Sequence, residues 1–380
     1  MTIQLAQNQS GYYQKGYEYR YFPPSAINDE WVWQTPQINL LLEKAAVKLG
    51  ELNSFARLVP NIDLFIQLHV TKEAVVSSRI EGTQTNVQEA VLPESEILPE
   101  HRNDWREVQN YTQALNQAIG HLQTLPLSSR LLRQTHATLL QNVRGEHKLP
   151  GEFRTSQNWI GGHSLADAVF IPPHHQHVNE LMSDLEQFLH NRDIHVPALI
   201  RIAIAHYQFE TIHPFLDGNG RIGRLLITLF LMSEGILEKP LLYLSSYFEK
   251  DKGLYYDNLM RVREKSDMLQ WLKYFLVGIE QTATLAVSAL SRIISLKARL
   301  EQNLQASFGR RTACAQRLLN ALFTQPAIRI EEVQKICDLS YKAANELVAQ
   351  MCEHGILREI TGQSRNRVFI FADYLAVFSD

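Results

Sequence analysis

Hydrophobic residues recur at helical spacing through most of the chain from Ile38 onward, whereas the first 35 or so residues lack this period. The pattern predicts two helices between residues 104 and 143, broken near Pro126, and three more over 178–190, 197–212 and 221–234. Glycines and prolines interrupt it at 92–100 and 149–175. The chain is therefore predicted to be mainly α-helical.

One short segment inside the irregular stretch has β character. It consists of Ala168, Val169, Phe170 and Ile171. β-branched and aromatic residues between turn-forming residues are typical of strands, so a small β-hairpin is expected here.

The last third of the chain has a different pattern. Residues 268–307 form a long amphipathic stretch, followed by helical segments at 315–323, 331–337 and 341–354, with a tight turn at 338–340. Residues 356–360 and 367–371 are expected to pair as a hairpin. Helix, helix–turn–helix and hairpin together predict a winged helix; a three-helix bundle with an irregular tail is the alternative.

These elements divide the chain into four predicted parts. Residues 1–100 form an N-terminal helical region, 101–280 a core, 281–309 a linking helix and 310–380 the winged-helix domain.

Composition changes this picture little. Of 380 residues, 45% are hydrophobic and 20% charged, as in ordinary soluble proteins, and a net charge of −3 gives no overall attraction to nucleic acids or anionic membranes. The N-terminus does not resemble a signal peptide, and no apolar run is long enough to span a bilayer. The three cysteines lack metal-ligand spacing. A cytoplasmic protein with no membrane association is expected.

Residues 213–224, HPFLDGNGRIGR, contain the densest cluster of candidate chemistry. Gly218–Gly223 matches G-x-G-x-x-G, the dinucleotide-binding pattern, but that pattern requires a strand directly before the glycines. Here a predicted helix precedes them, which disfavours a nicotinamide cofactor site.

The same residues suit binding of phosphates. Gly218 and Gly220 allow positive φ and close approach, and the helix that follows leaves its first N–H groups free for an anion. Arg221 and Arg224 share a face of that helix and can donate forked hydrogen bonds to phosphate oxygens.

Two further residues add reactive chemistry. Asp217 is an oxygen ligand suited to Mg²⁺ beside phosphates, and His213 has the side chain best suited to accept a hydroxyl proton. The cluster indicates transfer of a phosphorus group; helix caps and a solvated basic face are the alternative interpretation.

The segment resembles the complete signature H-x-F-x-[D/E]-G-N-G-R-x-x-R of Fic-domain proteins. Pro150–Arg154, Asn158–Gly162 and Phe170–Pro173 are similar to the loop and target-docking flap of that family, and the N-terminal helical region and C-terminal winged helix resemble a common bacterial Fic architecture. The resemblance implies a Fic-type helical core and transfer of AMP from ATP–Mg²⁺ to a Ser, Thr or Tyr hydroxyl of a target protein, and of the chain itself.

The resemblance also assigns roles to residues. His213 would be the base, Asp217 the metal ligand, and Ala168–Ile171 (Ala168, Val169, Phe170, Ile171) the target-docking flap. The implied ATP- and phosphate-binding set is Gly218, Asn219, Gly220, Arg221, Ile222, Gly223, Arg224 and Tyr256.

A second motif lies at the end of a predicted helix over Val70–Gly82. Glu81 faces the negative end of the helix dipole, and Ser77 lies four residues earlier on the same face. These local interactions alone would favour a solvent-exposed Glu81 at the end of the helix. Ser77-x-x-x-Glu81-Gly82 nevertheless resembles the inhibitory [S/T]-x-x-x-E-[G/N] motif of the Fic family, which implies that Glu81 pairs with Arg224 and denies it to the γ-phosphate.

Two other functions stay open. The chain could be a winged-helix transcription regulator with a nucleotide-sensing core, although residues 310–380 hold nine Lys/Arg against eight Asp/Glu, a weak footprint for DNA. Contact with protein or a homodimer is slightly preferred. The core could also transfer phosphate or phosphocholine, or remove AMP with Glu81 activating water.

Overall fold

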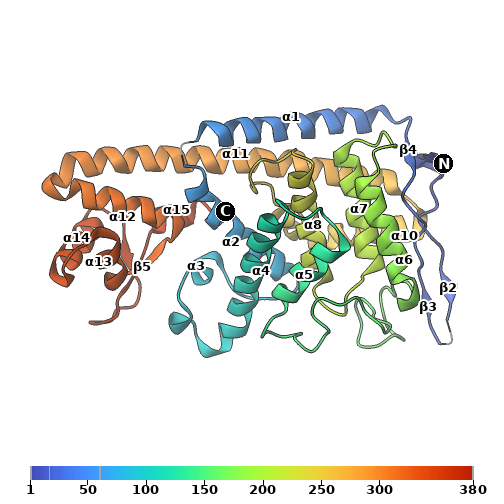
Figure 1. Ribbon diagram of the computed structural model, residues 1–380, viewed down its shortest axis with the longest axis horizontal. Coiled ribbons are helices and arrows are strands. Elements are labelled where there is room, and N and C mark those ends of the chain that lie inside the picture. Colours follow the sequence, from blue (N-terminus) through green and yellow to red (C-terminus); the bar gives the residue numbers. More distant parts are fainter. Residues whose placement is uncertain (1, 17, 60, 379–380) are drawn as a thin grey trace.

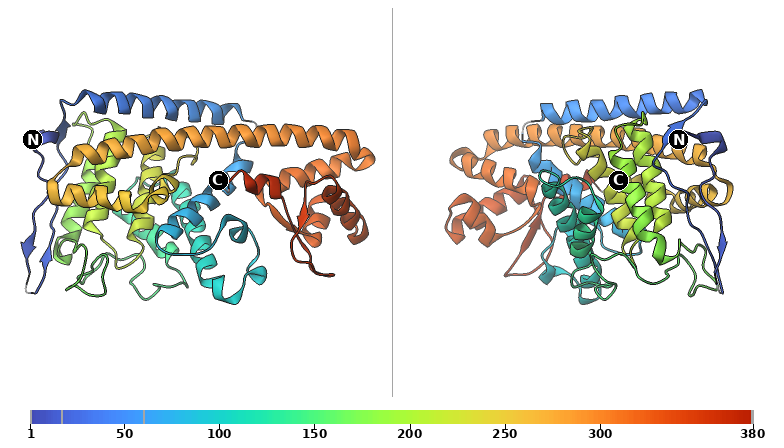
Figure 2. Two further views of the ribbon diagram at one scale, coloured as in Figure 1. Left: turned by 180° about the vertical axis from the view of Figure 1, so that it is seen from behind. Right: turned by 45° about the vertical axis from the view of Figure 1, so that its right-hand side comes forward.

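The computed structural model describes residues 2–16, 18–59 and 61–378 and is mainly α-helical (Figure 1). Two long helices, α1 (Pro36–Leu58) and α11 (Met268–Ser307), lie side by side along one edge of the molecule. The view from behind (Figure 2, left) shows α11 continuing past α1 to the C-terminal part. Its buried stripe includes Ile279, Ala283, Ala286, Leu290 and Ile293, as expected for an amphipathic helix.

Five helices surround the predicted phosphate-binding segment. They are α4 (Arg102–His121), α5 (Ser129–Leu139), α6 (Val178–His190), α7 (Ala198–Ile212) and α8 (Asn219–Ser233). α7 and α8 pack on each other and are buried along almost their whole length. Helices α9 (Ser245–Lys250) and α10 (Lys252–Lys265) lead from this core to α11.

Helix α2 (Asp63–Ile80) carries the second motif and packs against α4 and α9. It begins seven residues before the predicted start at Val70, because its first two turns bury Phe65 and Leu68 rather than ending in a loop. It ends as predicted: Glu81 is the C-cap and Gly82 has φ of 108°. The short helix α3 (Val87–Ala90) follows.

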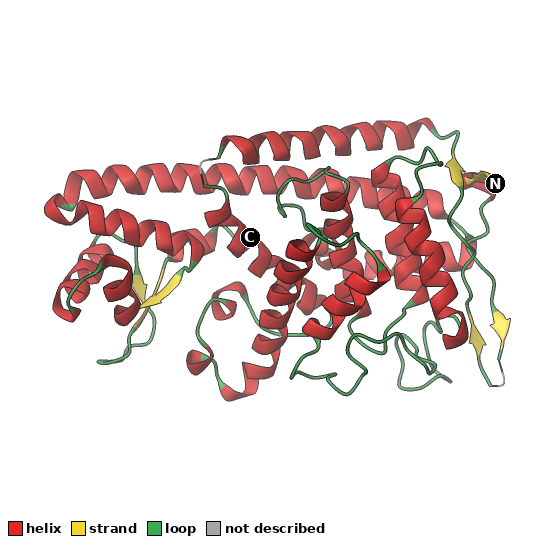
Figure 3. Ribbon diagram, viewed as in Figure 1, coloured by secondary structure: helices red, strands yellow, loops and turns green. Residues whose placement is uncertain are grey.

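Strands are few and lie at the two ends of the molecule (Figure 3). At the N-terminal end, β1 (Thr2–Gln4) pairs in parallel with β4 (Glu30–Val32), and β2 (Gln14–Lys15) pairs antiparallel with β3 (Arg20–Tyr21). Short 3₁₀ turns complete the chain at Leu5–Gln7, Glu94–Glu96, Pro99–His101, His175–His177 and Gly309–Arg311.

The C-terminal residues form helices and an antiparallel sheet. The helices are α12 (Thr312–Thr324), α13 (Ile330–Cys337), α14 (Tyr341–Glu353) and α15 (Ala372–Ala376). The sheet has the order β5–β7–β6, from β5 (Ala327–Arg329), β7 (Val368–Ile370) and β6 (Arg358–Glu359). Ser340 caps α14 by accepting a hydrogen bond from the Ala343 N–H. Strand β5 was not predicted.

The segment 168–171 does not form the predicted hairpin strands. Ile160 and Phe170 make a single antiparallel bridge, and the chain turns at once through Gly161 and Gly162, with φ of 68° and 71°. Phe170 is also buried against Phe22 and beneath the Arg263 guanidinium, so its β-like composition reflects burial as well as this single bridge.

The predicted boundary at residues 280 and 281 falls inside α11, which continues through it; the division into four parts stays a prediction. Among the described helices, none combines the length and the hydropathy needed to cross a membrane.

Candidate functional site

The loop between α7 and α8 brings the predicted catalytic residues together. His213 ends α7 in the left-handed conformation, with φ of 51°, and the chain then turns through Pro214 to Gly218. Phe215 is fully buried and stacks on His136, with ring centroids 3.8 Å apart. Asn219 closes the loop, because its side-chain amide both accepts from Phe215 N–H and donates to Phe215 C=O at 2.8 Å. The Asn219 side chain therefore fixes the shape of the loop.

Two buried side chains outside the motif hold this loop. Arg154 donates from Nε to the His213 carbonyl at 2.9 Å and from Nη2 to both the Ile212 and the Pro173 carbonyls. His136 Nδ1 accepts from the Gly151 N–H at 2.8 Å, which places its proton on Nε2, 3.0 Å from the Asp217 carbonyl oxygen. Both residues join the 149–175 stretch to the loop, and sequence reasoning gave neither a role in positioning it.

The His213 imidazole is neutral. Burial lowers its pKa to about 3, and the positive charges of Arg154 and Arg263 act in the same direction. A neutral imidazole can accept a proton, so the charge state matches the role of base.

Residues 218–220, at the start of α8, have backbone geometry suited to binding an anion, and they are called the cradle below. Gly218 has φ of 73°, and the first N–H groups of α8 point out of its N-terminus. A Cβ at Gly218 would be in ordinary contact with His136 at 3.5 Å, so the positive φ, and not the packing, favours glycine here. The Ile222 N–H already donates to the Gly218 carbonyl at 3.1 Å, and the Ile222 side chain is fully buried. The Ile222 side chain thus belongs to the hydrophobic core behind the cradle.

The close approach of Glu210 explains why position 223 is a glycine. A Cβ there would overlap Glu210 Oε1, and the Gly223 carbonyl accepts from His206 Nδ1 at 2.9 Å. Glu210 is buried, and burial raises its pKa to about 7 although the Arg224 charge lowers it. Gly223 therefore makes room for a buried carboxyl group beside the site.

The two motif arginines are both buried and both paired. Arg221 donates to Glu107 of α4 at 3.0 Å, and both side chains are 3% exposed. Arg144 approaches the other oxygen of Glu107 at 3.1 Å. Glu107 was not among the predicted site residues, because an acid on an amphipathic helix is usually solvated.

Arg224 is held by the end of α2. It donates from Nε to Ser77 Oγ at 2.8 Å and from Nη2 to Ser77 C=O at 2.9 Å and to Glu81 Oε1 at 2.7 Å. The Arg224 side chain is 2% exposed, whereas Glu81 keeps 34% of its side chain exposed. Burial raises the pKa of Glu81, but the ion pair with Arg224 outweighs it, so the net pKa lies below the ordinary value.

The Glu81 carboxylate lies directly over the cradle. A Cβ on Gly220 would overlap Glu81 Oε1 and would lie 2.9 Å from Arg224 Nη1. Lys252 adds a cation at the same end of α2, because its Nζ donates to the Ile80 carbonyl. The carboxylate thus lies against Gly220 at the start of α8.

Asp217 is the candidate metal ligand. Its side chain is 39% exposed, its Oδ1 accepts from the Gly218 N–H at 2.6 Å, and Oδ2 faces Gly145, where a Cβ would be 2.8 Å away. The described residues include no group of three or more acids, histidines and cysteines able to hold a metal ion. Mg²⁺ commonly binds one or two carboxylates and substrate phosphates, so Asp217 fits as one ligand among phosphate oxygens.

Tyr256 and the flap lie at the margins of the site. Tyr256 is 37% exposed and contacts Lys252, whose Nζ is 5.7 Å from its ring centroid. The neighbouring Tyr255 is buried and its hydroxyl lies 3.0 Å from His206 Nε2, so it belongs to the core. In the flap, Phe170 and Ile171 are buried, Val169 is 66% exposed and Ala168 is half-buried.

Comparison with known proteins gives matches over the same regions. The family model "Fic/DOC family N-terminal" matches residues 39–120 and "Fic/DOC family" matches 126–231. The protein adenylyltransferase Fic of Aedes aegypti is 33% identical over 144 residues, 38% of this chain and 26% of the relative. That of Culex quinquefasciatus is 35% identical over 155 residues, 40% and 28% of the two chains. The match thus spans about a quarter of the length of these relatives.

Solved structures share the fold. A Fic family protein from Desulfovibrio desulfuricans superposes with a TM-score of 0.57 at 20% identity, covering 89% of this chain and 96% of that one. A Fic-domain signalling protein from Bacteroides thetaiotaomicron gives 0.51 at 20% identity, covering 67% and 97%. These structures show the fold, whereas the two matched regions, 39–120 and 126–231, show that the chain belongs to the Fic/DOC family.

Proposed function

We propose that the protein transfers AMP from ATP–Mg²⁺ to a Ser, Thr or Tyr hydroxyl of a target protein, and to itself, and that Glu81 holds it inactive. The curated relatives are protein adenylyltransferases, and the motif that carries their chemistry is complete here. The proposal places the reaction in the cytoplasm, where ATP and magnesium are available.

In this proposal each residue has one task. The target hydroxyl oxygen bonds to the α-phosphorus, the bond from that phosphorus to the bridging oxygen breaks, and pyrophosphate leaves. His213 accepts the hydroxyl proton. Gly218, Asn219 and Gly220 hold the α- and β-phosphates, with the N–H groups of Asn219 and Gly220 as donors, because the Gly218 N–H donates to Asp217 Oδ1. Bound magnesium would neutralise phosphate charge, with Asp217 as its protein ligand.

The observation that carries the proposal is the place of Glu81. Its carboxylate overlies Gly220 at the start of α8 and pairs with Arg224 at 2.7 Å. A negative group held over Gly220 by a buried arginine is a competitor for phosphate, because both need the Arg224 guanidinium and the space at the start of α8. Arg224 becomes available to a γ-phosphate once Glu81 leaves.

The test uses the position of a radioactive label. Glu81→Gly is incubated with Mg²⁺ and ATP labelled on either the α- or the γ-phosphorus. Transfer of AMP attaches the α-label and releases the γ-label, and intact mass gives the group directly. Incorporation of γ-label alone would make the protein a phosphotransferase, and no incorporation with lysate present would contradict transfer to proteins.

Two further variants complete this experiment. His213→Ala in the Glu81→Gly background should lower incorporation by roughly 10²–10⁴-fold, the range for loss of a general base. Glu100→Gly, which removes an exposed carboxylate from a short 3₁₀ turn, is the control and should behave as the wild type.

We propose that the C-terminal part is a winged-helix module that contacts protein rather than DNA. Phe323 of α12 packs edge-on against Phe65 of α2, with centroids 5.2 Å apart, and Arg329 donates to Glu96 at 2.7 Å. The first contact joins the module to α2, at whose C-terminal end Glu81 lies, and the second joins it to the 3₁₀ turn Glu94–Glu96. Salt-dependent, sequence-specific DNA binding that survives His213→Ala would favour a transcription regulator instead.

A further inference from the structure

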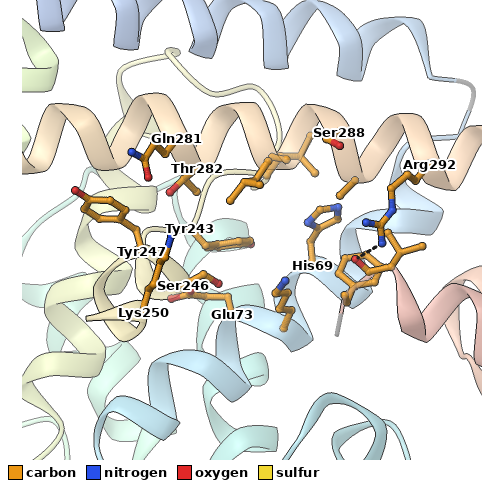
Figure 4. Close-up of a pocket in the computed structure, with 17 residues that line it drawn as sticks. His69, Glu73, Tyr243, Ser246, Tyr247, Lys250, Gln281, Thr282, Ser288 and Arg292 are labelled. Carbon is orange, nitrogen blue, oxygen red and sulfur yellow. Dashed lines mark hydrogen bonds between the residues drawn. The ribbon is translucent and has the colours of Figure 1, made fainter. Parts of the chain in front are cut away.

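A cleft of about 210 Å³ lies behind the inhibitory helix. It is enclosed by α2, α9, α11, the loop that carries Leu241 and Tyr243, and the segment Val377–Phe378 (Figure 4). An engineered apolar cavity of about 150 Å³ already binds benzene, so this volume suits a ring with a substituent.

Three buried polar groups of its wall lack partners. His69, Glu73 and Tyr243 are 7%, 3% and 8% exposed, and His69 Nε2, Glu73 Oε2 and the Tyr243 hydroxyl have no hydrogen-bonding partner within the described residues. Buried polar groups are almost always paired, with protein, water or a ligand. These three atoms have almost no accessible surface, so they lie within the wall of the cleft and make it polar without identifying an occupant.

Charge and shape narrow the class of occupant. Lys72, Lys250 and Arg292 give the wall three positive charges, and Glu73 is the sole acid among its described residues. Burial raises the pKa of Glu73 to about 7, so its negative charge is partly lost. The remaining wall combines uncharged polar side chains with apolar and aromatic ones, among them Tyr247 (Figure 4) and Phe378. An anion with a flat apolar body fits all three features.

We propose that this cleft binds a small aromatic carboxylate, and that the bound ligand strengthens the inhibition by Glu81. The second half rests on the proposed function, whereas binding itself does not.

The connection runs along one face of α2. His69, Glu73, Ser77 and Glu81 follow each other at four-residue spacing, so they share a face. The first two line the cleft and the last two hold Arg224. Glu73 Oε1 also accepts from Tyr111 and Ser245, which fixes α2 to α4 and α9.

The direction of the effect follows from the position of α2. The cleft has this shape when Glu81 lies on Arg224, because α2 forms one wall of both sites. A ligand that fits this shape binds the inhibited arrangement better, and so raises its population.

Binding is tested with benzoate as the probe, by calorimetry on the full chain. Ala289→Phe places a ring in the cleft and should weaken benzoate binding at least about tenfold. Ala298→Phe, an exposed position on the same helix outside the cleft, is the matched control and should bind as the wild type. Absence of binding to the wild type, or equal binding to Ala289→Phe, overturns the site.

The charge requirement has its own test. Lys250→Met should weaken benzoate about tenfold, which corresponds to about 1.4 kcal/mol, and should leave the neutral analogue benzyl alcohol within about twofold. Equal loss for both probes would show that Lys250 supports the cleft only by packing, and would overturn the assignment of an anion.

The effect of the ligand on inhibition is measured by amide hydrogen exchange in α2 and by the rate of self-labelling. Benzoate should slow amide hydrogen exchange over residues 63–80 in the wild type and lower its rate of self-labelling, but should not lower the rate of Glu81→Gly. If Glu81→Gly is inactive, the proposed function fails while the binding data still decide the site. Benzoate that binds without slowing exchange in α2 overturns the regulatory half alone.

Discussion

Two ion pairs at the start of α8 use the same chemistry in different surroundings. Arg221 pairs with Glu107 in the middle of α4, and both side chains are 3% exposed. Arg224 pairs with Glu81 just past the end of α2, and Glu81 keeps 34% of its side chain exposed. Both arginines belong to one helix, three residues apart, so the difference lies in where the acids are placed.

The pKa shifts of the two acids run in opposite directions. Burial raises the pKa of Glu107, and the charges of Arg221 and Arg144 do not fully offset it. Burial also raises the pKa of Glu81, but Arg224 outweighs it and the net pKa is lowered. The fold therefore holds the Glu107 pair in place, whereas the Glu81 pair is held by its own attraction at a partly exposed helix end. A contact of the second kind can open without unfolding the core.

The largest effect is expected for catalysis. In the Glu81→Gly background, Glu107→Ala should lower AMP transfer by about 10²-fold, because Arg221 loses the bond that fixes its position. Removal of Glu81 should therefore raise the rate of AMP transfer, whereas removal of Glu107 should lower it in the same assay. Label incorporation is measured beside a thermal melt that shows the variant to be folded. An unchanged rate of AMP transfer in Glu107→Ala would contradict the claim that the Glu107–Arg221 pair supports activity.

The next effect concerns the glycine beneath Glu81. Gly220→Ala should lower the free energy of unfolding of the wild type by about 1–3 kcal/mol, since its Cβ would overlap Glu81 Oε1. The loss should be smaller in the Glu81→Gly background, where the carboxylate is gone. Urea unfolding of the four proteins gives the coupling.

Gly50→Ala is the control for this comparison. Gly50 lies in α1 with nothing within 4 Å of its Cβ position, so the substitution should be neutral or should stabilise by up to about 1 kcal/mol. If Gly220→Ala costs the same in both backgrounds, Glu81 does not lie over the cradle.

The smallest effect is a difference in pH dependence. The folded pKa of Glu81 is depressed, so its contribution is present above the unfolded value of about 4.3 and is lost as pH falls through the folded pKa. The folded pKa of Glu107 is raised, so its ionisation opposes folding and stability recovers as pH falls through that pKa. Exposure of Glu81 keeps its effect small.

Matched glutamine variants make this visible in urea unfolding at pH values from about 6 to about 3. The stability difference between wild type and Glu81→Gln should shrink as pH falls, whereas that between wild type and Glu107→Gln should grow in favour of the wild type. Parallel curves would contradict the opposite pKa directions.

Local patterns in the sequence predicted the elements that form the site. The mainly α fold, the loop from His213 to Gly218 and the end of α2 at Glu81 follow from helical period, glycine and proline placement. The motif resemblance added the identity of the family, which the comparisons confirm. These features depend on residues close together in the chain.

The partners of the site residues could not be predicted in the same way. Glu107 lies 114 residues from Arg221, and Arg154 lies 59 from His213. Each looks ordinary in its own segment, because helical period says which face is buried but not what it meets. The β-like composition of 168–171 shows the reverse error, since Phe170 is apolar to pack on Phe22 and Arg263.

The most direct test of the account is the ratio of two rates. Self-labelling from ATP carrying the label on its α-phosphorus is measured for Glu81→Gly and for the wild type at equal protein, ATP and magnesium concentrations. Displacement of Glu81 from Arg224 and Gly220 should raise the rate at least about tenfold, within the 5–150-fold range typical of coupling between sites. Equal rates for the two proteins would contradict the claim that Glu81 competes with phosphate.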